Sequence, residues 1–306
     1  MSLPLSPRSL RFDSAATRLD RLYAAAHRHG ISAERLVLPA EGLLRGRDPE
    51  LHYLEWPGPQ RGPSVLMLHG GGLHAHTFDL VGNLVSRHAR CVALDLRGHG
   101  ESGWAGPGQY GASAIADDID AVVCALQLAP VVVVGHSVGG MGAMVWAARS
   151  PEGLAALMIV DVAPGMNQEG TGSVHEFVAA NPTFTDLDDV DRFFARGTTP
   201  SVAAGDSAAA NLRWDANGRL AFKYDTAQFA GIDLPLGDEL RAVAARIDAP
   251  TRVLRGQRSK VIDNEAAAEL AGLIPGASWA VVPDAGHTIQ SSNPAGLAAE
   301  IIAIAT

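Results

Sequence analysis

Residues 131–148 read VVVVGHSVGGMGAMVWAA, and this stretch decides the fold. Four consecutive valines predict a strand buried on both faces, because such strands are continuous apolar runs. The segment from Gly140 onward is rich in residues that favour a helix. Between them lies the pattern G-x-S-x-G at residues 135–139. The stretch therefore predicts a strand that turns sharply into a helix, with Ser137 at the turn.

The predicted turn gives Ser137 a chemical role. Flanking glycines remove the side chains that would collide in so tight a bend, and the serine hydroxyl projects from the top of the sheet. The helix behind it presents backbone N–H groups and the positive end of its dipole to a developing oxyanion. A strand before the pattern and a helix after it are the context of a nucleophile elbow. We therefore predict that Ser137 is a nucleophile.

Composition limits the classes of protein that fit. The chain has 306 residues, of which 47% are hydrophobic and 19% charged, so it can form one α/β domain with an insertion. The net charge of -9 argues against a nucleic-acid partner, which requires a basic surface. Cys91 and Cys124 are the two cysteines, and both are predicted to be small buried hydrophobic residues. So few cysteines exclude a disulfide framework.

The sequence shows no membrane or export signal. Its longest apolar runs are strand-sized, well below the ~20 residues that a membrane-spanning helix needs. Residues 1–10 contain prolines and an arginine but no continuous apolar core of a signal peptide. We expect a soluble, cytoplasmic protein without a membrane partner.

Strands and helices alternate along most of the chain. This order predicts right-handed crossovers and a mostly parallel sheet with helices on both faces. An amphipathic helix is predicted over residues 13–29, and an antiparallel pair of strands over 35–39 and 51–56. The strands of the alternating part are predicted at residues 65–68, 91–94, 131–134, 157–160, 252–254 and 278–282.

The alternation stops at Pro164 and resumes near residue 238. The intervening segment is aromatic-rich and too long for a loop, so it is predicted to be an inserted lid. Within it we expect helices over residues 174–180 and 188–196 and a hairpin turn over 215–219. The predicted units are an N-terminal helical extension (1–30), an α/β core (31–164 and 237–306) and a cap (165–236).

Four motifs together resemble the α/β-hydrolase family. They are HGGG at residues 69–72, DLRGHGES at 95–102, the elbow around Ser137 and AGH at 285–287, each following a predicted strand in the family's order. The resemblance covers nearly the whole chain. It implies the α/β-hydrolase fold, an α/β architecture with an eight-stranded, mostly parallel sheet and a cap inserted after the sixth strand.

His287 is the predicted general base. An imidazole can take the proton of a weakly nucleophilic serine and return it to the leaving group. The family order Ser, Asp, His requires a late histidine, and His287 follows the last predicted strand. His69, His99 and His136 also lie in family motifs but are predicted to orient loops.

The predicted acid departs from the commonest family pattern. Most relatives carry it just after the seventh strand, where this chain reads RGQRSKVID at residues 255–263 and places Lys260 at the expected position. The charge of Lys260 is wrong for stabilising an imidazolium. Asp161 follows the sixth strand, where some family members carry the acid, and is our first choice. Asp263 is the second, although it is placed like a helix N-cap.

Two backbone N–H groups are expected to form an oxyanion hole. The resemblance assigns one to Val138 and the other to Gly71, with Gly72 as the alternative. No glycine pattern matches a dinucleotide or phosphate loop, and no histidine or carboxylate cluster has zinc spacing. We therefore expect neither a cofactor nor a metal.

The predicted function is a serine hydrolase that cleaves a carboxylic ester or lactone of small to medium size. One alternative is a carbon–carbon bond hydrolase of ring-fission products, which shares this fold and triad. Another is a hydrolase-like ligand-binding protein with little turnover, a hypothesis that Lys260 motivates. Fold does not decide between substrates, and the oligomeric state stays open.

Overall fold

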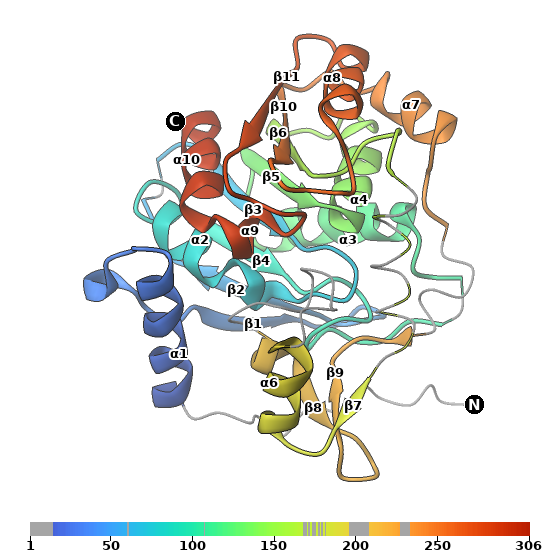
Figure 1. The fold of residues 1–306 in the computed structure, drawn as a ribbon. Coiled ribbons are helices and arrows are strands. Elements are labelled where there is room, and N and C mark those ends of the chain that lie inside the picture. The colour runs from blue at the N-terminus through green and yellow to red at the C-terminus, as the bar shows by residue number, and fades with distance from the viewer. Residues whose placement is uncertain are drawn as a thin grey trace.

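A large sheet organises the computed structural model, which describes residues 15–59, 61–106, 108–167, 182–195, 208–226 and 233–306, together with 170, 172, 176, 178 and 180. The sheet has eight strands in the order β1-β2-β4-β3-β5-β6-β10-β11 (Figure 1). Neighbouring strands run parallel, except in the pairs β1–β2 and β2–β4. The strands are β1 (Ala40–Leu44), β2 (Leu51–Trp56), β3 (Ser64–Leu68), β4 (Cys91–Leu94), β5 (Val131–His136), β6 (Leu154–Val160), β10 (Thr251–Gly256) and β11 (Ser278–Val282).

Helices cover both faces of this sheet, as predicted (Figure 1). One face is covered by α3 (Ala112–Ala125), α4 (Val138–Ala147), α7 (Asp238–Ala244) and α8 (Asn264–Leu273). The other is covered by α2 (Asp79–Val85), α9 (Ile289–Ser292) and α10 (Pro294–Ala305). The predicted N-terminal helix is α1 (Ala15–Arg28), which packs on α2 through Leu22 and Leu80.

The four valines of β5 show why the central strand is apolar throughout. Val131 and Val133 belong to the core under α3 and α4, whereas Val132 and Val134 belong to the core under α2 and α10. All four are fully buried. Successive side chains of a strand point to opposite faces, so a strand covered on both sides has no polar position. This burial fixes the strand whose end carries Ser137.

The predicted strand over residues 35–39 is wrong. Residues Ala33–Arg35 form a short 3-10 helix, and the strand β1 begins at Ala40. Pro39 has no N–H to donate to a ladder, so pairing with β2 starts just beyond it. Leu36 packs instead in the cluster with α1, and the Val37 amide bonds Asn83 Oδ1 at 2.8 Å.

The prediction of two buried cysteines is half wrong. Cys91 is buried in β4, and burial raises the pKa of its thiol to about 12. Cys124 is exposed near the end of α3. The buried face of α3 is made by Ile115, Ile119 and Val122, and Cys124 follows Val122 by two positions, which turns it toward solvent.

The described part of residues 165–236 forms a second, smaller sheet. Its strands are β7 (Thr183–Phe184), β8 (Leu212–Trp214) and β9 (Leu220–Phe222), in the order β7-β9-β8, with α6 (Leu187–Ala195) beside them (Figure 1). The predicted helix over 188–196 and the hairpin turn over 215–219 are thus confirmed. The helix expected over 174–180 lies largely outside the described residues.

The segment that directly follows β9 contacts the loop that follows β4. The Gly100 amide donates to Lys223 O at 2.7 Å, and the Asp225 amide donates to Gly98 O at 2.8 Å. Lys223 Nζ forms an ion pair with Glu101 at 2.7 Å. These contacts place the smaller sheet at the carboxyl ends of the parallel strands, which is the edge where open α/β sheets bind ligands.

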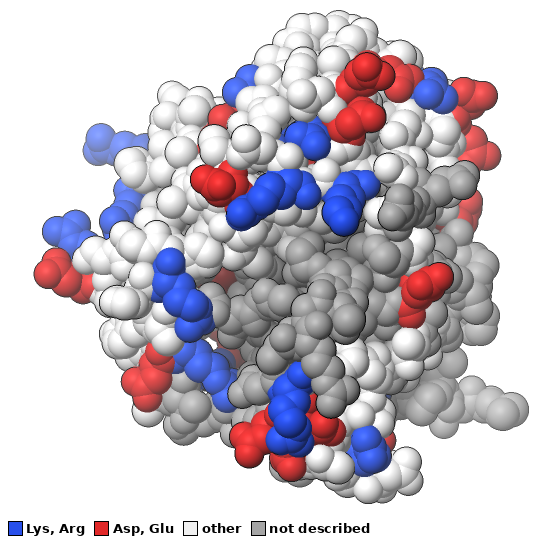
Figure 2. All heavy atoms as spheres, in the orientation of Figure 1, with Lys and Arg blue, Asp and Glu red and all other residues white. Residues whose placement is uncertain are grey.

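No helix in the described part of the chain has both the length and the apolar composition that a membrane-spanning segment requires. On the face seen in Figure 2, acidic and basic side chains of the described residues are interspersed over a mostly uncharged surface.

Candidate active site

Ser137 sits at the turn between β5 and α4 in a strained conformation. Its φ of 52° and ψ of -121° lie in a region that non-glycine residues rarely adopt. The turn is held by the Ser137 amide, which donates to Val160 O at 3.0 Å. Glycine is required beside it, because a Cβ on Gly135 would lie 2.6 Å from the Cα of Gly140. The predicted sharp turn is therefore present.

The glycine loop after β3 lies against this turn. A Cβ on Gly70 would lie 2.8 Å from His136 Nδ1 and 3.0 Å from Ser137 Cβ, so only glycine allows this approach. Among the described residues, no hydrogen bond uses the amide N–H of Gly71 or Val138. The amide of Gly72, the alternative donor, already donates to His99 Nε2 at 3.0 Å. Of the three predicted donors, Gly71 and Val138 are the two that a ligand could use.

Asp161 and His287 meet in a buried pair. Asp161 Oδ2 lies 2.7 Å from His287 Nδ1, and the two residues are 0% and 7% exposed. Asp161 follows β6 and has a positive φ of 54°, and its amide donates to Leu254 O at 2.8 Å. A carboxylate bonded to Nδ1 leaves Nε2 of the same ring as the atom that can accept a proton.

The Asp161 carboxylate has two further partners. Its Oδ1 accepts from the Gly256 amide at 2.8 Å, and its Oδ2 accepts from the Ser259 hydroxyl at 2.5 Å. Ser259 Oγ in turn accepts from the Val261 amide at 3.1 Å. Sequence reasoning did not identify Ser259. The only sequence feature that points to Ser259 is its position in the loop after β10, where relatives are expected to carry the acid.

Lys260 and Asp263 lie elsewhere. The Lys260 side chain is exposed, so the residue at the expected acid position faces solvent. Asp263 caps helix α8, with its Oδ1 accepting from the Ala266 amide at 2.8 Å. The structure brings Asp161, and not Asp263, against His287.

A second chain of hydrogen bonds holds the backbone carbonyl of His287. His136 Nε2 lies 3.0 Å from His287 O, and Gln290 Nε2 lies 3.2 Å from His136 Nδ1. A carbonyl oxygen can only accept, so His136 carries its proton on Nε2 and accepts on Nδ1. The two imidazole rings lie 4.6 Å apart between centroids. His136 therefore holds the backbone of His287 while lying directly before Ser137.

Burial keeps the loop histidines neutral. Desolvation lowers the pKa of His99 to about 3 and, with the nearby His287, holds the pKa of His136 well below its usual value. Neutral His99 can accept from the Gly72 amide, which a doubly protonated ring could not. His69 is also buried with a lowered pKa, mainly from desolvation, and accepts from the Leu96 amide at 3.0 Å.

Asp95 orders the loop behind the glycines. Its carboxylate accepts from the amides of Ala75 at 2.6 Å and Glu101 at 2.9 Å and pairs with His52 at 2.8 Å. Burial opposes its ionisation, but the hydrogen bond and charge of His52 hold the pKa of Asp95 well below its usual value. Asp95 is thus tied to two backbone amides and to His52.

The site can support nucleophilic catalysis without a metal ligand set. The His287 ring bonds Asp161 through Nδ1, and within the described part of the chain no hydrogen bond joins the ring to the Ser137 hydroxyl. In many enzymes this bond forms only when substrate binds. The described residues contain no group of three or more His, Cys, Asp or Glu side chains placed to hold a metal ion. The groups available for catalysis are the Ser137 hydroxyl, the His287 imidazole bonded to Asp161, and the backbone amides of Gly71 and Val138.

Comparison with known proteins identifies the family. A family model described as the alpha/beta hydrolase fold matches residues 63–294. The chain belongs to the α/β-hydrolase fold family. Two proteins illustrate its relatives. Esterase Rv0045c of Mycobacterium tuberculosis is 31% identical over 272 residues, covering 85% of this chain and 87% of that protein. The 2-(acetamidomethylene)succinate hydrolase of Mesorhizobium japonicum is 27% identical over 239 residues, covering 76% of this chain and 84% of that protein.

Solved structures agree with this α/β-hydrolase assignment. A structure of the M. tuberculosis esterase Rv0045c matches with a TM-score of 0.72 at 26% identity, covering 96% of this chain and 99% of that chain. The crystal structure of E-2-(acetamidomethylene)succinate hydrolase matches with a TM-score of 0.75 at 24% identity, covering 87% and 98% of the two chains. The second likeness is one of fold alone.

Proposed function

We propose that this protein is a serine hydrolase that cleaves a carboxylic ester or lactone through an acyl-enzyme on Ser137. One observation carries the proposal. The buried Asp161–His287 pair, 2.7 Å apart, lies at the same sheet edge as a serine held in a strained turn. The family membership and the relatives named as esterases support it.

In the first half-reaction, Ser137 Oγ attacks the carbonyl carbon and gives its proton to His287 Nε2. The Asp161 carboxylate, bonded to Nδ1, stabilises the imidazolium that forms. The negative charge on the carbonyl oxygen is stabilised by the N–H groups of Gly71 and Val138. The bond to the leaving oxygen then breaks, and His287 returns the proton to it, releasing an alcohol and leaving an ester on Ser137.

In the second half-reaction, water attacks the acyl-enzyme. His287 Nε2 takes a proton from the water, the same two N–H groups stabilise the oxyanion, and the bond to Ser137 Oγ breaks. The proton returns to Ser137, so that a carboxylic acid leaves and the enzyme is restored. No step requires a redox or metal cofactor.

Residues 165–236 are the proposed cap over this site. The observation that supports it is a contact with the glycine loop after β3: Asn211, directly before β8, donates from Nδ2 to Gly72 O at 2.8 Å. A Cβ on Gly72 would also lie 2.8 Å from Val178 and 3.7 Å from Tyr224 Cε1. The described aromatic residues Phe184, Phe222 and Tyr224 are buried in one hydrophobic cluster, which forms the core of the proposed cap.

The hypothesis of a ligand-binding protein with little turnover rests on Lys260. The exposure of Lys260 and the complete hydrogen bonding of Asp161 argue against it, because an acid is available at His287 without that position.

The test is hydrolysis of p-nitrophenyl butyrate by the wild-type protein and by Ser137→Ala. We expect turnover by the wild type and a loss of about 10³-fold or more in the variant, with unchanged thermal unfolding. A fluorophosphonate should label the wild type at Ser137 and leave the variant unlabelled by mass spectrometry. Full activity in Ser137→Ala, or labelling at another residue, would overturn the proposal.

A further inference from the structure

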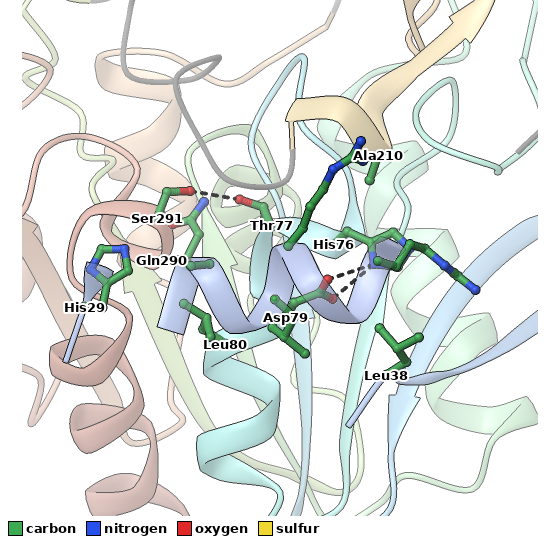
Figure 3. A pocket seen from close by; sticks show the side chains of 13 residues that line it. His29, Leu38, His76, Thr77, Asp79, Leu80, Ala210, Gln290 and Ser291 are labelled. Carbon is green, nitrogen blue, oxygen red and sulfur yellow. Dashed lines mark hydrogen bonds and ion pairs between the residues drawn. The ribbon is translucent and has the colours of Figure 1, made fainter. Parts of the chain in front are cut away.

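A pocket lies beside the candidate active site, between α1, the η2–α2 segment (Ala75–Phe78 and Asp79–Val85) and α9 (Figure 3). Of the described residues that line it, none is Ser137, Asp161 or His287. It is therefore a separate place from the one where the ester carbonyl would sit. We propose that this pocket binds a small amphipathic carboxylate that also carries a hydroxyl or N–H group, such as an ω-hydroxy acid.

One side of the pocket is apolar. Aliphatic side chains line it, namely those of Leu22 and Ala25 in α1, Leu38 and Leu80. The hydroxyls of Thr77 and Ser291 lie 3.3 Å apart, and one of them donates to the other (Figure 3). The aliphatic side suits a short hydrocarbon chain of a ligand. Burying that chain lowers the free energy in proportion to the apolar area removed from water.

Gln290 supplies an unused hydrogen-bond acceptor. The residue is 2% exposed and lines the pocket, and its buried Oε1 has no hydrogen-bond partner among the described residues. The orientation of its amide follows from its neighbour. His136 must donate from Nε2 to His287 O, so its Nδ1 can only accept, and Gln290 must present its NH₂ group there. The carbonyl oxygen of Gln290 is left to accept from a ligand's O–H or N–H.

Arg18 supplies an unused donor on a permanent cation. Its Nη1 donates to Glu41 Oε1 at 2.7 Å, whereas its buried Nε has no hydrogen-bond partner in the part of the chain that the structure describes. Arg21 also lines the pocket and adds a second positive charge. The acidic lining residue, Asp79, is held by His76 at 3.1 Å. A guanidinium nitrogen bonds most strongly to a carboxylate or another oxyanion.

The two unpartnered atoms together define the ligand. A carboxylate would accept from Arg18 Nε, a hydroxyl or amide N–H would donate to Gln290 Oε1, and a short chain between them would cover the leucines. A ligand at Gln290 would also contact the hydrogen-bond chain that runs through His136 to the His287 backbone. Such an acid could arise from lactone opening at Ser137 or reach the pocket as a free metabolite.

The test measures binding by isothermal titration, with 4-hydroxybutyrate, 6-hydroxyhexanoate and 8-hydroxyoctanoate as probes. Hexanoate lacks the hydroxyl, and 1,6-hexanediol lacks the charge. We expect the best hydroxy acid to bind about tenfold more tightly than either comparison compound. Arg18→Gln should weaken the hydroxy acid about tenfold and leave the diol unchanged. Gln290→Met should weaken the hydroxy acid and leave hexanoate unchanged.

Two variants serve as controls. Glu41→Gln removes the anion that competes for Arg18 and should tighten carboxylate binding, whereas Arg149→Gln, in an exposed pair with Asp117, should change nothing. Absence of binding by every probe, or equal binding by wild type, Arg18→Gln and Gln290→Met, would overturn the proposal. These titrations need no turnover, so their failure is distinct from a failure of the proposed function. Inhibition of caprolactone hydrolysis by 6-hydroxyhexanoate in wild type but not Arg18→Gln would identify lactone opening as the source.

Discussion

The Asp161 carboxylate is surrounded by donors that suit its ionised form. A buried charge is costly unless it is fully hydrogen-bonded, and Asp161 accepts from Gly256, Ser259 and His287. The first bond comes from the last residue of β10 and the second from the loop that follows it, and together they fix both oxygens. The consequence is that the third bond, to His287, has a defined direction, which a general base needs.

Ser259 is predicted to act as a positioning residue for Asp161. Ser259→Ala should lower kcat for p-nitrophenyl butyrate about three- to thirtyfold, because the lost hydrogen bond to a charged partner is of intermediate strength, and KM should stay near its wild-type value. Ser259→Thr keeps the hydroxyl and should restore most of the rate. Equal losses of kcat in the alanine and threonine variants would show that the Ser259 hydroxyl does not position Asp161.

At the residue scale, the sequence was sufficient for side chains tied to a local pattern. The strand, turn and helix around Ser137 predict its position. Asp161 is chosen because it follows the sixth strand, where the family resemblance implies that some members carry the acid. Ser259 could not be found in this way. Its contact with Asp161 joins residues 98 positions apart, and it exists because β6 and β10 are neighbours in the sheet. Nothing in the local sequence around Ser259 indicates that neighbour.

At the scale of elements, the glycine loop after β3 and the turn before α4 form one packed unit. Gly70 is the point of closest approach, so Gly70→Ala should push the loop away from His136 and Ser137. Because the proposed oxyanion donor Gly71 would lose its geometry, we expect kcat to fall about 10- to 100-fold. The measurement is ester turnover alongside thermal unfolding.

Gly272→Ala is the matched control for that change. Gly272 lies inside α8 with nothing within 4 Å of its would-be Cβ, so alanine should stabilise the protein by about 0.5–1 kcal/mol and leave turnover unchanged. If Gly70→Ala were as active as Gly272→Ala, the close packing of the loop would have no part in catalysis.

Elements were predictable where burial dictates the pattern and less so where a single residue interrupts it. The strands β3, β4 and β5 are apolar throughout because helices cover both faces, and their positions matched the prediction. The edge strand β1 did not, because Pro39 delays pairing and Leu36 packs on α1 instead. Local apolar content alone does not say which neighbour an edge segment will choose.

At the scale of the whole molecule, buried neutral histidines make stability depend on pH. Desolvation lowers the pKa of His69, His74, His99 and His136 in the folded state. In the unfolded chain each titrates near 6.5, so below that pH the unfolded state binds protons that the folded state does not. The free energy of unfolding must therefore fall as pH decreases from about 6.5, by up to about 1.4 kcal/mol per pH unit for each histidine.

His99→Gln should reduce this pH dependence. Glutamine can still accept from the Gly72 amide but takes up no proton, so the slope between pH 6.5 and 4.5 should fall by about one proton. This window stays above the range in which Asp95, with its lowered pKa, contributes. Urea unfolding of both proteins at several pH values gives the slopes. Parallel slopes for wild type and variant would contradict the account.

The most direct test of the proposed mechanism compares p-nitrophenyl butyrate hydrolysis by the wild type, Asp161→Asn and Asp263→Asn. Asp161 contacts His287, whereas Asp263 caps α8, so the two substitutions separate a role in catalysis from one in helix stability. We predict a loss of about 10³- to 10⁴-fold in kcat for Asp161→Asn and near wild-type turnover for Asp263→Asn. Near wild-type turnover by Asp161→Asn together with a collapse in Asp263→Asn would contradict the assignment of the acid.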